Sequence, residues 1–170
     1  MAKQFFVLGI GGTGMRCIES LIHLCAMGMF DDTDIHLLAL DTDKNNGNFV
    51  RLKKLKEAYV NTKGLKAENR VYHKETFFSA NIKYYEFSPN YETKSTFKKV
   101  FGYGDTRYHH REETDLADLV LDNHVEEFNL QHGYRAQTHL GSMMMYQSIV
   151  EAAKSRLSNG LKNFVSALIT

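Results

Sequence analysis

The sequence has few of the residues that cross-link or interrupt a chain. It contains two cysteines, one proline and no tryptophan among 170 residues. Cys17 and Cys25 stand eight positions apart in a segment that we expect to be one helix, which places them about 12 Å apart along its axis and excludes a disulfide between them. Reduced thiols are typical of a cytoplasmic protein.

An excess of one charge and long apolar runs are lacking as well. Lys and Arg number 21 and Asp and Glu number 20, so the net charge of +1 gives no broad attraction to nucleic acid or acidic lipid. No apolar run approaches the roughly 18 residues of a membrane span, and the chain opens without a basic and apolar leader. We therefore expect a soluble cytoplasmic protein with no transmembrane segment and no nucleic-acid partner.

The first 60 residues predict the organisation of the fold. Residues 3–8 and 35–40 are continuous apolar runs, typical of buried strands. Residues 13–30 and 49–60 carry apolar side chains at a helical period, and the basic face of the second helix is expected to be solvated. Strand, helix and strand in this order predict a right-handed parallel crossover. The fold class is therefore α/β, a Rossmann-like parallel sheet with flanking helices.

The rest of the chain is less regular, although 170 residues suit one domain better than two. Residues 61–113 mix strand-like composition with loop signals such as Pro89, and we expect an irregular insertion. Residues 114–170 are expected to be helical, with the last two helices separate or interrupted at Asn159 and Gly160. The chain stops inside an apolar run, so a partial domain is expected. The helices are expected over 114–128, 142–156 and 161–169.

A glycine-rich turn connects the first expected strand to the first helix. Residues 9–14 read Gly-Ile-Gly-Gly-Thr-Gly, the pattern G-x-G-x-x-G, which gains meaning between a strand and a helix. Glycines permit positive φ and close approach, and a helix start offers unpaired N–H groups with a partial positive charge. We predict a phosphate site there; the alternative is a tight turn that binds no ligand. Its candidate residues are Gly11, Gly12, Thr13 and Gly14.

The glycine turn belongs to a longer pattern. Residues 6–14 read FVLGIGGTG, a long helix follows, and residues 38–43 read LALDTD. This order resembles the start of the tubulin/FtsZ superfamily of GTPases, in which a glycine loop is followed by a strand ending in Ala-Val-Asn-Thr-Asp. The closer similarity is to the large bacterial tubulin-like proteins, and it includes residues 22–28 (IHLCAMG), 41–48 (DTDKNNGN) and 133–142 (GYRAQTHLGS). It covers roughly the first half of a GTPase domain.

The resemblance implies which residues bind the nucleotide. The glycines match the family's first nucleotide loop, with Thr13 in place of a glycine and Arg16 where FtsZ usually has asparagine. The acidic turn matches the second loop, beside the phosphates and metal, with Asp41 replacing asparagine. The implied set is Gly11, Gly12, Thr13, Gly14, Arg16, Asp41, Thr42 and Asp43.

The implied function is binding of GTP or GDP, with Mg²⁺ as a candidate metal, in a bacterial cytoplasmic protein that self-associates or joins a protein complex. The family's later glycine signature and its activating acidic loop do not occur in these residues, so we expect negligible GTP hydrolysis and assign no catalytic residue. Two alternatives stay open. One is an NAD(P)- or FAD-binding oxidoreductase domain with Asp41 on the ribose, although it lies 27 residues beyond Gly14 where ~20 is usual. The other is a non-catalytic interaction fragment.

The sequence gives weaker indications of metal binding or of nucleophilic catalysis. His109 and His110 stand beside acidic residues, but no C-x-x-C or H-E-x-x-H spacing supports a metal site. His23 and His36 fall within apolar elements and are interpreted as core or boundary histidines. The run Met143–Met145 is interpreted as a face that a further segment covers. No G-x-S-x-G nucleophile elbow occurs.

Overall fold

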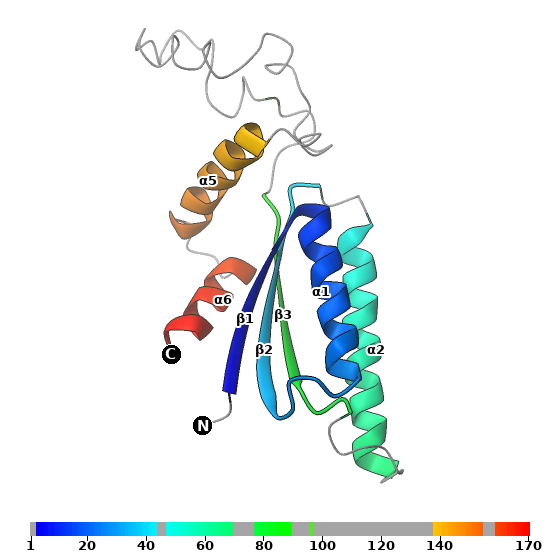
Figure 1. Cartoon of the computed structure of the whole chain (residues 1–170). Coiled ribbons are helices and arrows are strands. Elements are labelled where there is room, and N and C mark those ends of the chain that lie inside the picture. Colours follow the sequence, from blue (N-terminus) through cyan, green and yellow to red (C-terminus); the bar gives the residue numbers. More distant parts are fainter. Residues whose placement is uncertain (1–2, 44–46, 70–76, 90–95, 97–137, 155–158) are drawn as a thin grey trace, which may run out of the picture.

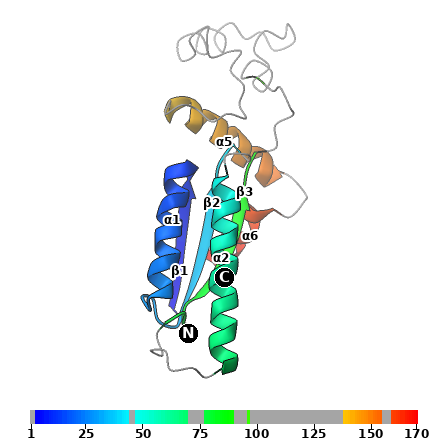
Figure 2. The same cartoon turned by 90° about the vertical axis from the view of Figure 1, so that its right-hand side faces the viewer.

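The chain forms a parallel sheet between two layers of helices in a computed structural model (Figure 1). The strands are ordered β1-β2-β3, with α1 and α2 on one face and α6 on the other (Figures 1 and 2). The predicted α/β class is confirmed. The elements are β1 (Lys3–Ile10), α1 (Gly11–Ala26), β2 (Thr33–Leu40), α2 (Asn48–Asn69), β3 (Asn81–Phe87), α5 (Thr138–Lys154) and α6 (Gly160–Ile169). The structure describes residues 3–43, 47–69, 77–89, 96, 138–154 and 159–170.

The register of the strands places the glycine turn and the acidic turn together at the carboxyl end of the sheet. Ile10 at the end of β1 lies opposite Leu40 at the end of β2, and Leu40 lies opposite Phe87 of β3. Parallel strands must be joined by crossovers, and here α1 and α2 make them. The strands therefore end where these two helices begin.

An aliphatic core closes the face under α1 and α2. The helical period of α1 directs one stripe of side chains toward β2, and α2 adds a second stripe. Burial raises the pKa of the Cys25 thiol to about 11, so this thiol stays protonated and unreactive at neutral pH. The buried members are Met15, Ile18, Ile22, Cys25, Ile35, Leu37, Ala39, Phe49, Leu52, Tyr59 and Ala80.

The opposite face carries a smaller, more aromatic core. Phe164 of α6 packs against Leu38, Leu40 and Phe87, with Phe6 and Tyr85 partly buried beside them. Helix α5 packs in turn on α6. Within α5, Met144 is fully buried and Met145 joins the α6 cluster. The methionine run is therefore largely core, and its interpretation as an uncovered face is wrong.

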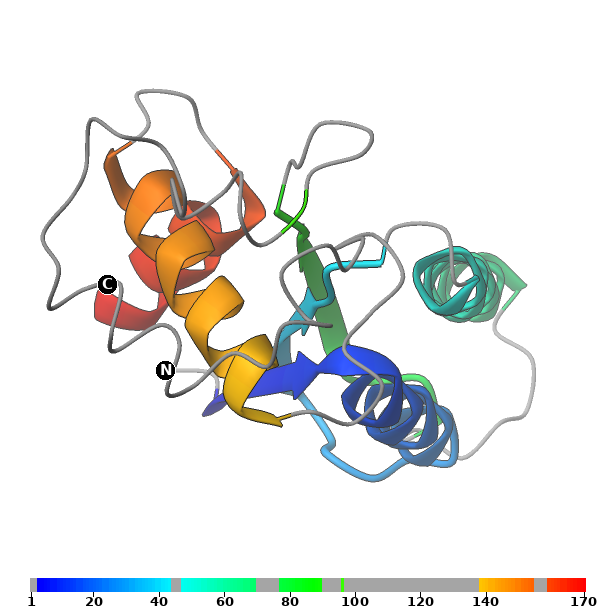
Figure 3. The ribbon, with the colours of Figure 1, turned by 90° about the horizontal axis from the view of Figure 1, so that it is seen from above.

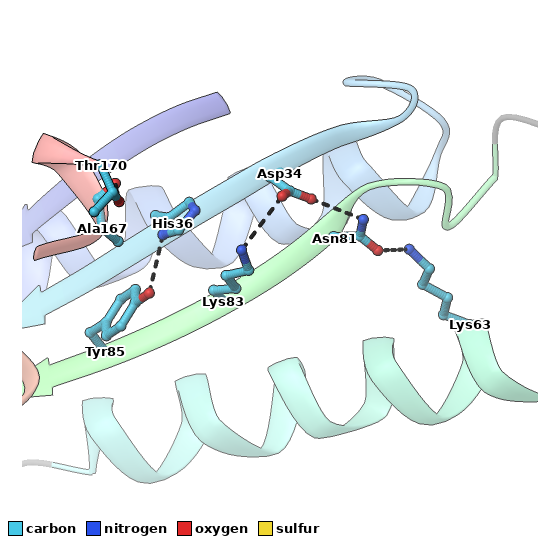
Figure 4. Close-up of polar contacts among 8 residues, drawn as sticks. All are labelled: Asp34, His36, Lys63, Asn81, Lys83, Tyr85, Ala167 and Thr170. Carbon is cyan, nitrogen blue, oxygen red and sulfur yellow. Dashed lines mark hydrogen bonds and ion pairs between the residues drawn. The ribbon is translucent and has the colours of Figure 1, made fainter. Parts of the chain in front are cut away.

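Hydrogen bonds and one ion pair between side chains link β2 to β3 among the described residues (Figure 4). His36 is 3% exposed and its Nδ1 lies 3.1 Å from the Tyr85 hydroxyl, so its placement in the core is confirmed. Asn81 donates to Asp34 at 2.9 Å, and Lys83 pairs with the same carboxylate at 3.5 Å. His23 is exposed on α1, so its interpretation as a core or boundary residue is wrong.

The prediction that β1 is a buried strand is wrong, whereas β2 is buried over nearly its whole length. Phe5, Leu8 and Ile10 are 44%, 50% and 59% exposed. Within the described part of the chain β1 pairs only with β2, and α6 lies mainly against β2 and β3, although Phe164 also contacts Phe6 of β1. An apolar run specifies a strand, but the burial of that strand depends on its place in the sheet.

Several boundaries differ from the sequence expectations. The first helix includes the glycine turn and ends at Ala26, and the second continues to Asn69, so part of the expected irregular insertion is helical. The same stretch supplies β3. The chain has two separate final helices, and Asn159 caps the second by accepting from the Lys162 N–H at 2.9 Å. The helix expected over 114–128 lies outside the described residues.

Among the described residues, no helix has the length and apolar character needed to cross a bilayer.

Candidate nucleotide-binding site

The candidate site lies at the carboxyl end of the sheet, where β1 and β2 end. Helix α1 follows β1 without an intervening loop, because Ile10 ends the strand and Gly11 starts the helix. The acidic turn follows β2 directly at Asp41, and α2 begins at Asn48. Since Ile10 and Leu40 are neighbours in the register, the glycine turn and the acidic turn lie side by side.

Glycine is needed in the turn for two different reasons. Gly11 has φ of 66°, a left-handed conformation that side chains disfavour. Gly9 and Gly14 allow the end of β1 to touch the first turn of α1. A Cβ on Gly14 would lie 2.7 Å from the carbonyl carbon of Gly9, too close for any other residue. The glycines thus fix the helix start tightly against the strand.

The start of α1 presents its backbone donors without a side-chain cap. Ile10 occupies the N-cap position, makes no side-chain capping hydrogen bond, and no acidic residue lies in the first turn. The first N–H groups of a helix lack intrahelical acceptors and carry part of the helix dipole. Thr13 and Arg16 are exposed on this part of α1. This end of the helix is suited to an anion.

The acidic turn is ordered by its own first residue. Asp41 is 8% exposed, and its Oδ1 accepts a hydrogen bond from the Asp43 backbone N–H at 3.1 Å. The Asp41 N–H donates to the carbonyl of Phe87 at 3.3 Å, which extends the sheet by one bond. Thr42 is also buried, whereas Asp43 is half-buried. Asp41 therefore shapes the turn, and Asp43 is the more accessible carboxylate.

Asn48 is a site residue that the sequence did not predict. Its Nδ2 lies 2.9 Å from the position that a Cβ on Gly12 would take, so its amide sits directly over the glycine turn. Its Oδ1 accepts from Arg51 Nη2 at 2.9 Å, and Arg51 Nε donates to Glu19 Oε1 at 2.7 Å. With the oxygen engaged by Arg51, the amide NH₂ is turned toward Gly12.

The structure therefore brings together the two predicted segments and adds a third. The glycine turn with Arg16 comes from α1, the acidic turn follows β2, and Asn48 opens α2. The position of Asn48 just before the apolar residue Phe49 is a helix-start signal in the sequence. Its location over Gly12 depends on how α1 and α2 pack, which no local pattern specifies.

A metal cluster of histidine, cysteine and acidic side chains does not occur among the residues that the structure describes. His109 and His110 lie outside those residues. Asp41 and Asp43 remain the carboxylates nearest in sequence to the end of β2, where the family resemblance implies a metal.

No family model, curated protein or solved structure matches this chain. The architecture and the geometry around α1 are therefore the structural grounds for a functional proposal. The tubulin/FtsZ resemblance adds an expectation about the nucleotide base.

Proposed function

We propose that this chain binds a guanine nucleotide, with a phosphate group at the amino end of α1. The observation that carries the proposal is the uncapped start of α1, held against β1 by Gly9 and Gly14. Backbone N–H groups at such an end bind phosphate oxygens well, because donors and dipole act together. The choice of guanine rests on the resemblance of the glycine and acidic turns to the tubulin/FtsZ superfamily.

Side chains around the turn complete the proposed phosphate site. Asn48 supplies an amide donor above Gly12, and the exposed Thr13 supplies a hydroxyl. Arg16 adds a positive charge on α1. Asp43 is proposed to help hold Mg²⁺ through water, which suits a hard cation that prefers oxygen ligands. The proposal includes a cytoplasmic location, where such nucleotides are abundant.

A dinucleotide-binding oxidoreductase domain is the second candidate, because Asp41 directly follows β2, where a ribose carboxylate is found in Rossmann domains. The burial of Asp41 and its bond to the Asp43 N–H argue against that role. A carboxylate already engaged in shaping a turn has less capacity to accept from a ribose. Guanine-nucleotide binding is therefore the preferred proposal.

The test is a titration of the chain with fluorescent GDP, fluorescent ADP and NADH. We expect GDP to bind most tightly, and we expect Gly12→Val to weaken it by at least about tenfold, because the new side chain displaces the Asn48 amide and fills the phosphate space. Gly64→Ala is the matched control: Gly64 is exposed on α2, and alanine favours a helix.

Two outcomes contradict the proposal. Tighter binding of NADH than of GDP would favour the oxidoreductase candidate. Unchanged GDP affinity in a Gly12→Val variant whose circular dichroism matches the parent would show that the glycine turn is structural only.

A further inference from the structure

His36 is a titratable side chain enclosed between the sheet and α6. It is 3% exposed, and its ring is stacked with the rings of Phe6 and Tyr85, at 4.5 Å and 5.9 Å between centroids. Phe164 of α6 contacts the same two rings edge-on, at 5.6 Å and 5.7 Å. Figure 3 shows α6 on the side of the sheet away from α1 and α2. The side chain that anchors α6 therefore packs on the two rings that enclose His36.

The two nitrogens of the His36 ring differ in their hydrogen bonding. Nδ1 lies 3.1 Å from the Tyr85 hydroxyl (Figure 4), whereas Nε2 is buried and has no partner among the described residues. A neutral imidazole has one donor and one acceptor nitrogen, but an imidazolium carries two N–H donors and a full charge. A buried charge with an unpaired donor costs far more free energy than an unpaired neutral nitrogen. The packing of α6 on the sheet therefore favours the neutral ring.

The surroundings of His36 lower its pKa below the ordinary 6.5. Burial is the largest cause; Lys83 of β3, opposite His36 in the register, adds to it, and Asp34 of β2 opposes it. β1 places the uncharged Phe6 opposite the ring, and Lys162 is the only titratable side chain of α6. The aromatic faces around the ring attract a cation, but they offer no acceptor to an Nε2–H. The neutral ring is therefore preferred while α6 is docked.

We propose that protonation of His36 releases α6 from the sheet, so that the contact between this helix and the sheet is a pH-sensitive switch. Release lets water reach Nε2 and solvate the imidazolium, and it uncovers the apolar cluster of Leu38, Leu40 and Phe87. The core under α1 and α2 is a separate cluster that does not include His36, so these helices keep their packing. The switch does not depend on the proposed nucleotide binding.

The linkage between proton binding and docking sets the direction and size of the effect. The docked state has the lower pKa, so docking is strongest above pH 6.5 and weakens as the pH falls below 6.5 toward the pKa of the docked state. Within that window, each pH unit multiplies the ratio of released to docked α6 by up to about tenfold. Between about pH 7 and about pH 5.5, this ratio should therefore rise by up to about eightfold.

The first test measures hydrogen exchange of the chain at about pH 7 and about pH 5.5, corrected for the intrinsic pH dependence of exchange. We expect protection to fall in α6 and to stay unchanged in α1. His36→Phe keeps an aromatic ring in the stack and should abolish the fall, whereas His23→Gln, at an exposed histidine of α1, should retain it. An equal loss of protection in α1, no loss in α6, or a loss that persists in His36→Phe would each overturn the proposal.

The second test is reciprocal and leaves His36 in place. An NMR titration of the His36 ring gives its pKa in the parent chain, in Phe164→Ala and in Val165→Ala. Because Phe164→Ala weakens the docking of α6, it should raise the pKa of His36 toward 6.5. Val165→Ala is the matched control, since Val165 is 44% exposed on the same helix, and it should leave this pKa unchanged. The proposal fails if Phe164→Ala leaves the pKa of His36 at its parent value, or if the parent value is not below 6.5.

Discussion

The two faces of the sheet are covered in different ways. Helices α1 and α2, of 16 and 22 residues, cover one face with an aliphatic core, and the Arg51–Glu19 ion pair at 2.7 Å joins them. The other face is covered by α6, of ten residues, over an aromatic cluster that contains His36. The first face is assembled from consecutive elements. The second depends on Phe164 meeting strands that lie more than 70 residues earlier in the chain, so its formation requires closing a long loop.

This difference bears on the proposed site. The glycine turn, the acidic turn and Asn48 all open or precede helices of the first face. Their positions are held by Gly9 against Gly14, by the aliphatic core and by the Arg51–Glu19 pair. The site should therefore keep its geometry when the second face loosens, and lose it when the first face is damaged.

The largest loss in the free energy of unfolding is expected from Leu52→Ala, which opens a cavity in the core between α1 and α2. Leu52 is fully buried, and such substitutions cost about 2–5 kcal/mol. Urea denaturation should show this loss in the free energy of unfolding. The matched control is Leu65→Ala, since Leu65 is 57% exposed on the same helix. Equal losses in the two variants would contradict the burial of the first face.

Phe164→Ala, on the other face, is expected to lower the free energy of unfolding by less than Leu52→Ala does. Phe164 anchors α6 through edge-on contacts with Phe6 and Tyr85 at 5.6 Å and 5.7 Å. Phe164 belongs to a core cluster separate from the one under α1 and α2, so we expect α6 to undock while β1, α1, β2 and α2 stay packed. Hydrogen exchange should rise in α6 and change little in α1. Increased exchange in α1 would show that the two faces unfold as one unit.

The first face was predictable from the sequence to a degree that the second was not. Apolar runs, glycines and a helical period predicted the two strands and two helices of the first face, because each signal is local. β3 was missed as a sheet strand because its residues face α2 on one side and α6 on the other, so no clean alternation appears. The exposure of Leu8 and the position of Asn48 over Gly12 depend on tertiary packing, which the local pattern does not encode.

His36, on the second face, is expected to make the free energy of unfolding depend on pH, with an effect of intermediate size. Burial lowers the pKa of His36 below its usual 6.5, and Lys83 lowers it further, while Asp34 opposes the shift. The folded state therefore binds the proton less readily than the unfolded state. The free energy of unfolding should be highest above pH 6.5 and should fall as the pH drops below that value toward the folded pKa.

His36→Phe should remove this pH dependence, although it also removes the partner of the Tyr85 hydroxyl. His23→Gln, on the exposed part of α1, should retain the dependence. Asp34 titrates separately, since its hydrogen bond from Asn81 lowers its pKa below 3.8. A fall in stability between pH 6.5 and 5 that persists in His36→Phe would assign the effect to another group.

The smallest effect on stability is expected from Glu19→Gln on the first face. The Arg51–Glu19 pair is partly exposed, with Arg51 at 46%, and pairs of this kind contribute about 0.2–1 kcal/mol. The effect on the site should be larger than this, because Arg51 also holds the Asn48 oxygen and so directs the amide toward Gly12. A loosened Arg51 holds that amide less firmly, and a donor that is less preorganised binds a phosphate less well. We therefore expect GDP affinity to fall more, in free energy, than the stability measured by urea denaturation. Lys53→Gln removes the ion pair of α2 with Glu86 on β3 and should lower stability by a similar amount without changing GDP affinity. If the two variants affect GDP binding equally, then Arg51 joins the helices but does not orient Asn48.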